Sequence, residues 1–155
     1  MLDIPDDELR ALDALNRKHV EYLLIGGYAM RFYGADRDAC DVDLLTSSSR
    51  DNAANLYGAV QELIGHPPAF DTKDLEEPRK RIRLWRSGYE LEVLTSVEGL
   101  DFAIAYRDRT QATERGVTIP VVSRRDLLFI KKAAAQHEKR RAKELRDIAF
   151  LESGD

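Results

Sequence analysis

The chain has 155 residues, of which 43% are hydrophobic and 34% charged, and its formal net charge of -4 argues against a protein whose main role is to coat nucleic acid. This length predicts a single domain, residues 1–155, and the one cysteine, Cys40, excludes an internal disulfide and a cysteine-cluster zinc site. The acidic start and the lack of any run of roughly 18 apolar residues predict neither a signal peptide nor a membrane span, so we expect a soluble cytoplasmic protein.

The first predicted elements lead to a pair of glycines. Pro5 and the three acids after it are typical of a helix start, and an apolar stripe continues that helix. Residues 20–25 read as a buried strand that ends at Gly26 and Gly27, and helical spacing resumes over 28–33. Because glycines let an anion approach the backbone and the following helix adds the positive end of its dipole, this junction predicts a phosphate-binding turn.

Two aspartates follow the glycines. Asp41 and Asp43 begin a stretch, residues 41–46, that reads as a strand, so both carboxylates leave the same face with their Cα atoms roughly 7 Å apart. Carboxylates beside a phosphate-binding turn suit Mg²⁺, which is usually held by one or two carboxylates plus substrate phosphates. Acidic pairs at strand ends are often only solvated surface groups. This pair indicates a metal site because two glycines precede it.

The middle of the chain is predicted to supply a third acid. Its expected elements are a helix over 53–64, a loop over 66–78 that forms a mobile lip over the site, and an antiparallel hairpin over 81–94. Glu90 and Glu92 share one face of the second hairpin strand. Either carboxylate, on a strand beside residues 41–46, would complete a three-acid metal site.

The last third of the chain reads as a helical turn around 102–106, a short hairpin over 110–122 and two C-terminal helices within about 123–152. Ser123 is the expected cap of the first of these helices. The second is expected to bury five apolar side chains, namely Ala142, Leu145, Ile148, Ala149 and Leu151. Residues 131–146 hold seven basic and two acidic residues, which indicates either a solvated helix face or a surface for RNA or triphosphate.

These blocks, in this order, resemble the DNA polymerase beta superfamily of nucleotidyltransferases. The likeness is closest to the small bacterial minimal nucleotidyltransferases and the abortive-infection toxin-type nucleotidyltransferases. The most specific block is the strand, the two glycines and the Asp-Val-Asp that follows. The segments that carry the resemblance are 22–29, Arg37, 41–43, 91–94, 121–123, 126–131 and 143–148.

The resemblance implies a fold, a cofactor and a site. The fold is of α/β (α+β) type, with a mixed or antiparallel twisted sheet of about four to six strands flanked by helices, a catalytic core over about 20–95 and C-terminal helices over about 123–152. One or two Mg²⁺ ions, with Mn²⁺ as a substitute, are expected on the catalytic residues Asp41, Asp43 and Glu92. The nucleotide phosphates are expected on Gly26, Gly27, Arg37 and Lys131.

The sequence also departs from the superfamily pattern. Many members carry serine where this chain has Gly27, and threonine before the first aspartate, where this chain has the segment 37–40. Both changes remove hydroxyls that would contact phosphate. The superfamily more often has aspartate at the position of Glu92, and this change keeps Glu90 open as the alternative third carboxylate.

Three hypotheses about function follow. The first is an Mg²⁺-dependent nucleotidyltransferase that moves an NMP group from a nucleoside triphosphate such as ATP to a protein side chain or to tRNA or another RNA, as part of a toxin–antitoxin or phage-defence pair with a partner protein. The second is a catalytically silent module that binds a nucleotide or a partner protein. The third, based only on the basic run, is a plain nucleic-acid-binding module with salt-sensitive, Mg²⁺-independent binding.

Overall fold

The computed structural model describes residues 2–39, 41–84, 91–136 and 141–154. In chain order the elements are α1 (Asp6–Arg17), β1 (Tyr22–Ile25), α2 (Gly26–Phe32), β2 (Val42–Thr46), α3 (Arg50–Ile64), α4 (Thr72–Glu76), β3 (Arg81–Arg83), β4 (Leu91–Leu94), α5 (Phe102–Arg107), β5 (Thr110–Glu114), β6 (Val117–Val121), α6 (Arg124–Ala135) and α7 (Arg141–Ser153). The turn of the predicted hairpin, with Glu90, lies outside the described residues, as does Cys40.

The strands form one sheet in the order β3-β4-β2-β1-β6-β5. Within the described residues, β1 pairs antiparallel with β2 and parallel with β6, and β2 pairs parallel with β4. The two hairpins, β3–β4 and β5–β6, are antiparallel. The predicted mixed sheet of four to six strands with two C-terminal helices is therefore confirmed.

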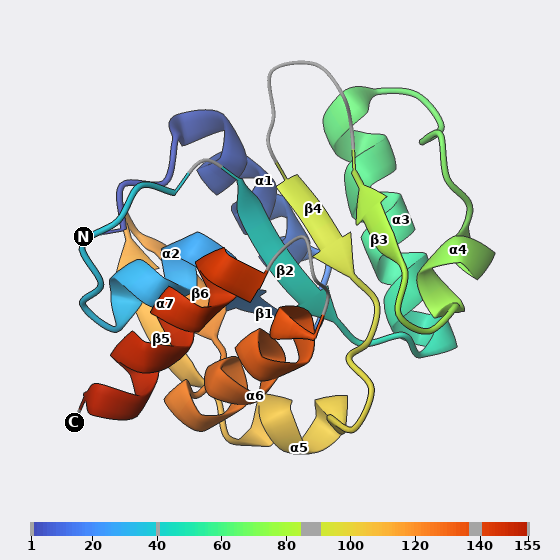
Figure 1. Ribbon diagram of the computed structural model, residues 1–155. Helices are drawn as coiled ribbons and strands as arrows, with labels where there is room; N and C mark the ends of the chain where they lie inside the picture. The colour runs from blue at the N-terminus through green and yellow to red at the C-terminus, as the bar shows by residue number, and fades with distance from the viewer. Residues whose placement is uncertain (1, 40, 85–90, 137–140, 155) are drawn as a thin grey trace.

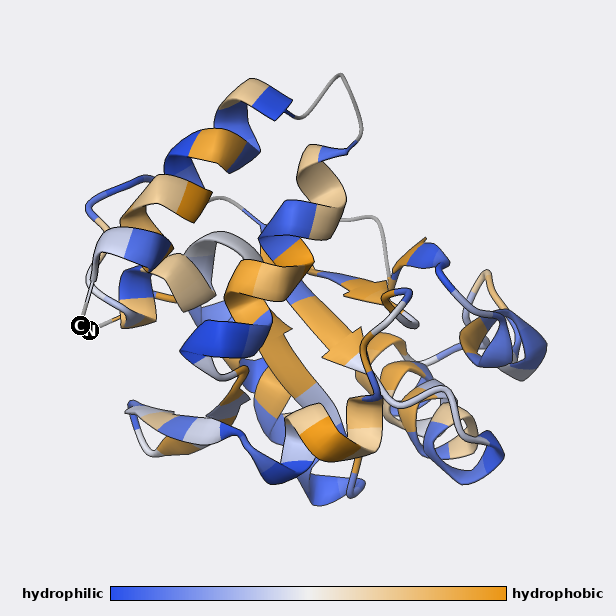
Figure 2. Ribbon diagram, turned by 60° about the horizontal axis from the view of Figure 1, so that its bottom comes forward, coloured by the Kyte–Doolittle hydropathy of each residue, from blue (hydrophilic) through white to orange (hydrophobic). Residues whose placement is uncertain are grey.

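The helices cover the sheet from both sides. Figure 1 shows α1 and α3 on one face and α6 with α7 on the other, and Figure 2 shows hydrophobic residues concentrated on the central strands. β1 and β2 are the most enclosed strands, since Leu23, Leu24 and Leu44 are fully buried. Burial on both faces explains why β1 reads in the sequence as a continuous apolar run.

Local signals set several of the helix ends. The hydroxyl of Ser49 accepts a hydrogen bond from the backbone N–H of Asn52 at the start of α3, and Ser123 does the same for Asp126 at the start of α6. Gly65 ends α3 in the left-handed conformation, with φ of 77°. The predicted helix 53–64 and the cap at Ser123 are thus confirmed.

The structure corrects two expectations. Residues 66–78 contain the short helix α4, whose start is stabilised by a capping box between Asp71 and Asp74. The segment continues to Glu77, whose carbonyl accepts from the hydroxyl of Thr95. Because Thr95 follows the Leu94 end of β4, the structure does not place this segment as a lip over Glu92.

The second correction concerns the buried face of α7. Of the five apolar residues predicted to be buried, Ile148 and Leu151 are buried, whereas Ala142, Leu145 and Ala149 are exposed. Glu144 and Asp147 are buried in their place. The reason is electrostatic, because both acids face a buried lysine on α6, as described below.

Within the described part of the chain, no helix combines the length and apolar character that crossing a membrane requires.

Candidate active site

The glycine pair and the second aspartate meet where β1 passes into α2. β1 ends at Ile25, whose register partner on β2 is Asp43, and α2 begins at Gly26 with φ of 71°. A Cβ at Gly26 would lie 2.5 Å from Oδ2 of Asp43. Only glycine fits this position, since positive φ is unfavourable for other residues and a side chain would clash with the carboxylate of Asp43.

Gly27 faces a different neighbour. A Cβ at this position would lie 3.1 Å from Cβ of Ala39 and 3.8 Å from Nη2 of Arg37. The segment between α2 and β2 therefore folds back over the start of α2. The glycine pair lies between the carboxylate of Asp43 on one side and the guanidinium of Arg37 on the other.

Glu92 is the neighbour of Asp43 on the next strand. The two residues are register partners in the parallel β2–β4 pair, so their side chains leave the same face of the sheet. Asp41 lies directly before β2, two residues from Asp43. Arg81 on β3 binds Glu92, with 3.2 Å between Nη1 and Oε1. The predicted juxtaposition of Asp43 and Glu92 is therefore present, with Arg81 as an additional member.

The environment of Asp43 disfavours its negative charge. Burial, followed by the charges of Glu92 and Asp41, raises the pKa of Asp43 from 3.8 to about 6, although Arg81 and Lys131 act in the opposite direction. Among the described residues, no hydrogen-bond donor contacts this carboxylate. An acid that is partly desolvated and lies beside two like charges is more typical of a functional site than of a structural one.

The donor chemistry fits a divalent cation, but the ligand set is incomplete. Carboxylate oxygens are the ligands that Mg²⁺ prefers, and a cation would relieve the repulsion among Asp41, Asp43 and Glu92. Yet no three acidic, histidine or cysteine side chains of residues 2–39, 41–84, 91–136 and 141–154 gather closely enough to hold a metal ion. The site thus fits an ion held by one or two carboxylates plus phosphates rather than an all-protein cage.

Arg37 and Lys131 occupy an ion-pair cluster that sequence analysis missed. Nζ of Lys131 lies 2.9 Å from Oδ2 of Asp147 and 3.1 Å from Oε2 of Glu144. Nη1 of Arg37 lies 2.5 Å from the same Oδ2 of Asp147. Burial alone would raise the pKa of Asp147, but the two cations hold it below its ordinary value. The spacing of Glu144 and Asp147, one helical turn apart, was the available signal.

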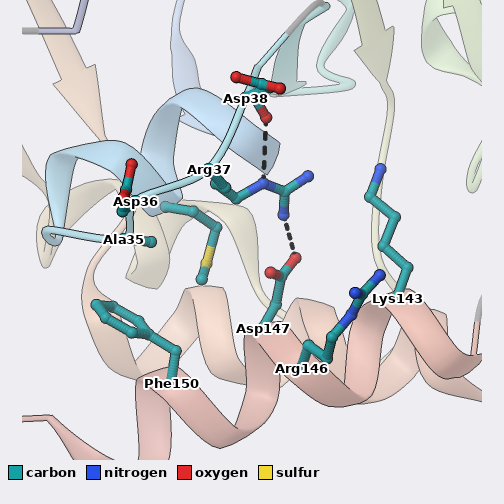
Figure 3. Close-up of a pocket in the computed structure, with 9 residues that line it drawn as sticks. Ala35, Asp36, Arg37, Asp38, Lys143, Arg146, Asp147 and Phe150 are labelled. Carbon is teal, nitrogen blue, oxygen red and sulfur yellow. Dashed lines mark hydrogen bonds and ion pairs between the residues drawn. The ribbon is translucent and has the colours of Figure 1, made fainter.

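The cluster connects three separate parts of the chain. Lys131 is on α6, Glu144 and Asp147 are on α7, and Arg37 comes from the segment between α2 and β2. Figure 3 shows Arg37 reaching to Asp147 beside a pocket of about 550 Å³. The pocket is lined by Met30, Ala35, Asp36, Arg37, Asp38, Lys143, Arg146, Asp147 and Phe150.

The described basic residues of the segment 131–146 are less accessible to nucleic acid than the composition of the segment indicates. Lys131 is only 6% exposed and is paired as described, and Lys132 forms an exposed ion pair with Glu152, with 3.3 Å between Nζ and Oε2. Lys139 and Arg140 lie outside the described residues. Lys131 and Lys132 therefore join α6 to α7, whereas Lys143 and Arg146 are exposed and line the pocket, so only part of the run fits the hypothesis of a plain nucleic-acid-binding module.

Comparison with solved structures identifies the fold. An antigenic nucleotidyltransferase-like protein from Paracoccidioides brasiliensis matches 96% of this chain and 77% of its own, with a TM-score of 0.56 and 21% identity. A protein from Thermotoga maritima with a provisional nucleotidyltransferase assignment matches 88% of this chain and 86% of its own, with a TM-score of 0.52 and 17% identity. No protein-family model and no curated protein matches the chain. The chain therefore has a nucleotidyltransferase-like fold.

Proposed function

We propose that the protein is an Mg²⁺-dependent nucleotidyltransferase that moves an NMP group from a nucleoside triphosphate to an acceptor. The observation that carries the proposal is the position of Asp43, desolvated beneath Gly26 and beside Glu92, in a chain with a nucleotidyltransferase-like fold. Burial and the charge of Glu92 disfavour the ionised form of this carboxylate, although Arg81 and Lys131 act in the opposite direction, and a bound cation would stabilise it. Its position at a glycine turn supports a role in binding phosphate through a metal.

Asp43, together with Asp41 or with Glu92 once it leaves Arg81, would hold the cation. When bound, Mg²⁺ neutralises phosphate charge and lowers the pKa of an acceptor hydroxyl. In the proposed transfer the acceptor oxygen forms a bond to the α-phosphorus, the bond from that phosphorus to the β-phosphate breaks, and pyrophosphate leaves. The acceptor proton passes to solvent. The protein itself supplies positioning and charge, through the backbone at Gly26 and Gly27.

Arg37 and Lys131 are the proposed partners of the triphosphate. Both are near the carboxylate site, since Arg37 adjoins Gly27 and the charge of Lys131 acts on Asp43. Both are occupied by carboxylates of α7 in this structure. A triphosphate would therefore have to exchange with Asp147 and Glu144.

The acceptor and the biological role are also proposals. A protein hydroxyl or an RNA end, including tRNA, fits the chemistry equally. The resemblance of the segments quoted above to abortive-infection toxin-type enzymes supports a role in a toxin–antitoxin or phage-defence pair with a partner protein.

A catalytically silent, nucleotide- or partner-binding module is the second candidate. Three contacts favour it, because Arg81 neutralises Glu92 while Asp147 neutralises Arg37 and Lys131. The lack of hydroxyl groups at Gly27 and Ala39 also favours the silent module, because it removes possible contacts to phosphate. In that case a nucleoside triphosphate binds, but no pyrophosphate is released with any acceptor.

The test is a transfer assay. The protein is incubated with each α-³²P-labelled nucleoside triphosphate, Mg²⁺ and either lysate proteins or total RNA, and label in macromolecules is measured together with pyrophosphate. We expect label with the wild type, loss of at least a hundredfold in Asp43→Asn, and no label in EDTA. Glu98→Gln, which removes an exposed carboxylate paired with Arg79, is the control. Equal labelling by wild type and Asp43→Asn refutes the proposal, and binding without transfer supports the silent module.

A further inference from the structure

Helix α7 buries only a few of its apolar side chains fully, and Phe150 packs partly buried against the core. Of its residues, Ile148 and Leu151 supply the buried apolar side chains, while Leu145 is 52% exposed. The other buried side chains on α7 are the acids Glu144 and Asp147. Near its C-terminal end, Arg124 of α6 donates to the carbonyls of Phe150 and Leu151. In the half of α7 that precedes Ile148, the side-chain contacts to the rest of the protein therefore include those of the two carboxylates and a hydrogen bond from Nε of Arg141 to the carbonyl of Ala135.

These carboxylates bind the two cations that are proposed above to contact the triphosphate. Oδ2 of Asp147 lies within 2.9 Å of both Nζ of Lys131 and Nη1 of Arg37, and Glu144 adds a second anion to Lys131. The cluster therefore holds two positive and two negative side chains, and their formal charges sum to zero. Glu144 Oε2 nevertheless makes no aligned hydrogen bond, although it lies 3.1 Å from Lys131. Asp147 therefore provides the hydrogen-bonded contacts to Arg37 and Lys131, and Glu144 adds an ion pair to Lys131.

A polyanion that binds Lys131 or Nη1 of Arg37 must compete with α7 for these donors. Lys131 is only 6% exposed and its ammonium already contacts both carboxylates, Nη1 of Arg37 contacts Asp147, and a buried carboxylate without its cation is strongly unfavourable. Binding of the polyanion and docking of the first half of α7 are therefore opposed. The pocket of about 550 Å³ is lined by Arg37 and Asp147, so this ion pair of the cluster can be reached from solvent.

We propose that α7 is an intramolecular clamp, in which Asp147 and Glu144 occupy Lys131 and Arg37 in the resting protein and a triphosphate-bearing ligand displaces them. This inference rests on the proposed function only for the identity of the ligand. It predicts that nucleotide affinity is limited by the strength of α7 docking. It also predicts that ligand binding loosens the first half of α7 instead of ordering it.

The first experiment measures binding of inorganic tripolyphosphate, which has no base and cannot be a transfer substrate. Calorimetry at constant ionic strength compares wild type, Asp147→Asn and Glu152→Gln. Asp147→Asn removes the carboxylate shared by both cations, and we expect its affinity to rise about tenfold, equivalent to about 1.4 kcal/mol. Glu152→Gln makes the same charge change on α7 but breaks only the exposed pair with Lys132, and its affinity should change by less than about twofold.

Unchanged or weaker binding by Asp147→Asn overturns the clamp, and an equal rise in both variants overturns it too, because net charge alone would then explain the effect. If Asp147→Asn does not fold, by circular dichroism, hydrogen exchange of the wild type decides the question. We expect tripolyphosphate to accelerate amide exchange in residues 141–147 and to leave α1 and α3 unchanged. Slower or unaltered exchange in 141–147 contradicts the proposal.

These measurements also separate the clamp from the proposed function, since neither requires turnover. A protein that transfers nucleotide but shows no change in α7 is an enzyme without this clamp. A protein whose α7 responds to tripolyphosphate but which releases no pyrophosphate has the clamp without the activity.

Discussion

Asp43→Asn should stabilise the folded protein in the absence of metal. The wild-type carboxylate is desolvated and lies beside Glu92 and Asp41, and these conditions raise its pKa from 3.8 to about 6. Asparagine keeps the shape of the side chain and removes the charge. The substitution that is expected to abolish nucleotidyl transfer should therefore also remove an unfavourable electrostatic interaction from the fold.

The magnitude follows from that pKa. One pKa unit corresponds to 1.36 kcal/mol, so the ionised carboxylate destabilises the folded state by about 3 kcal/mol as an upper bound. Because Asp43 is partly exposed, solvent screening reduces the expected gain to about 1–2 kcal/mol at pH 7.5. The folded state binds a proton more tightly than the unfolded state, so wild-type stability falls as pH rises from 3.8 to about 6. The advantage of Asp43→Asn should therefore appear over this interval and stay constant above it.

The assay is urea unfolding of wild type and Asp43→Asn in EDTA between pH 4 and pH 8. Asp36→Asn, which removes an exposed carboxylate, is the control and should change the free energy of unfolding by less than about 0.5 kcal/mol. The reasoning fails if Asp43→Asn is less stable than the wild type at pH 7.5. It fails equally if the difference between the two proteins does not depend on pH.

Three further predictions concern the fold around the site and can be checked by urea unfolding. Gly26→Ala should destabilise by more than 1 kcal/mol, because φ is 71° and the new Cβ meets a carboxylate, whereas Gly58→Ala, in an open position on α3, should stabilise by up to about 1 kcal/mol. Glu114→Ala should cost about 2–3 kcal/mol and expose the N-terminal segment to proteolysis, since this buried carboxylate accepts three backbone N–H groups there. Ile148→Ala should cost about 2–4 kcal/mol and Leu145→Ala less than about 1 kcal/mol, and the reverse ranking would contradict the observed face of α7.

Sequence patterns predicted the elements that carry strong local signals. The apolar run before Gly26, the serine caps at Ser49 and Ser123 and the glycine at position 65 each act through the backbone of a few neighbouring residues, so they can be recognised without the fold. The short helix α4 was missed although its capping box is also local. Its charged composition and the flanking prolines obscured that signal.

The candidate site was predictable in its strands but not in its ion pairs. A glycine turn followed by Asp43, with a later strand carrying Glu92, indicates carboxylates on neighbouring strands once those strands pair. The spacing of Glu144 and Asp147 indicates that the two acids share one face of α7, but the pairing of that face with Lys131 depends on how two helices cross. Periodicity therefore selected Leu145 for the interior, whereas the buried cation on α6 favours Glu144 and Asp147.

The central claim is that Asp43 belongs to a divalent-metal site that acts together with a nucleoside triphosphate. Electron paramagnetic resonance of free Mn²⁺, measured with a non-cleavable α,β-methylene triphosphate, tests it directly by comparing wild type with Asp43→Asn. The account predicts saturable Mn²⁺ uptake by the wild-type complex and at least tenfold weaker uptake by the folded variant. Equal uptake by the two proteins would contradict it.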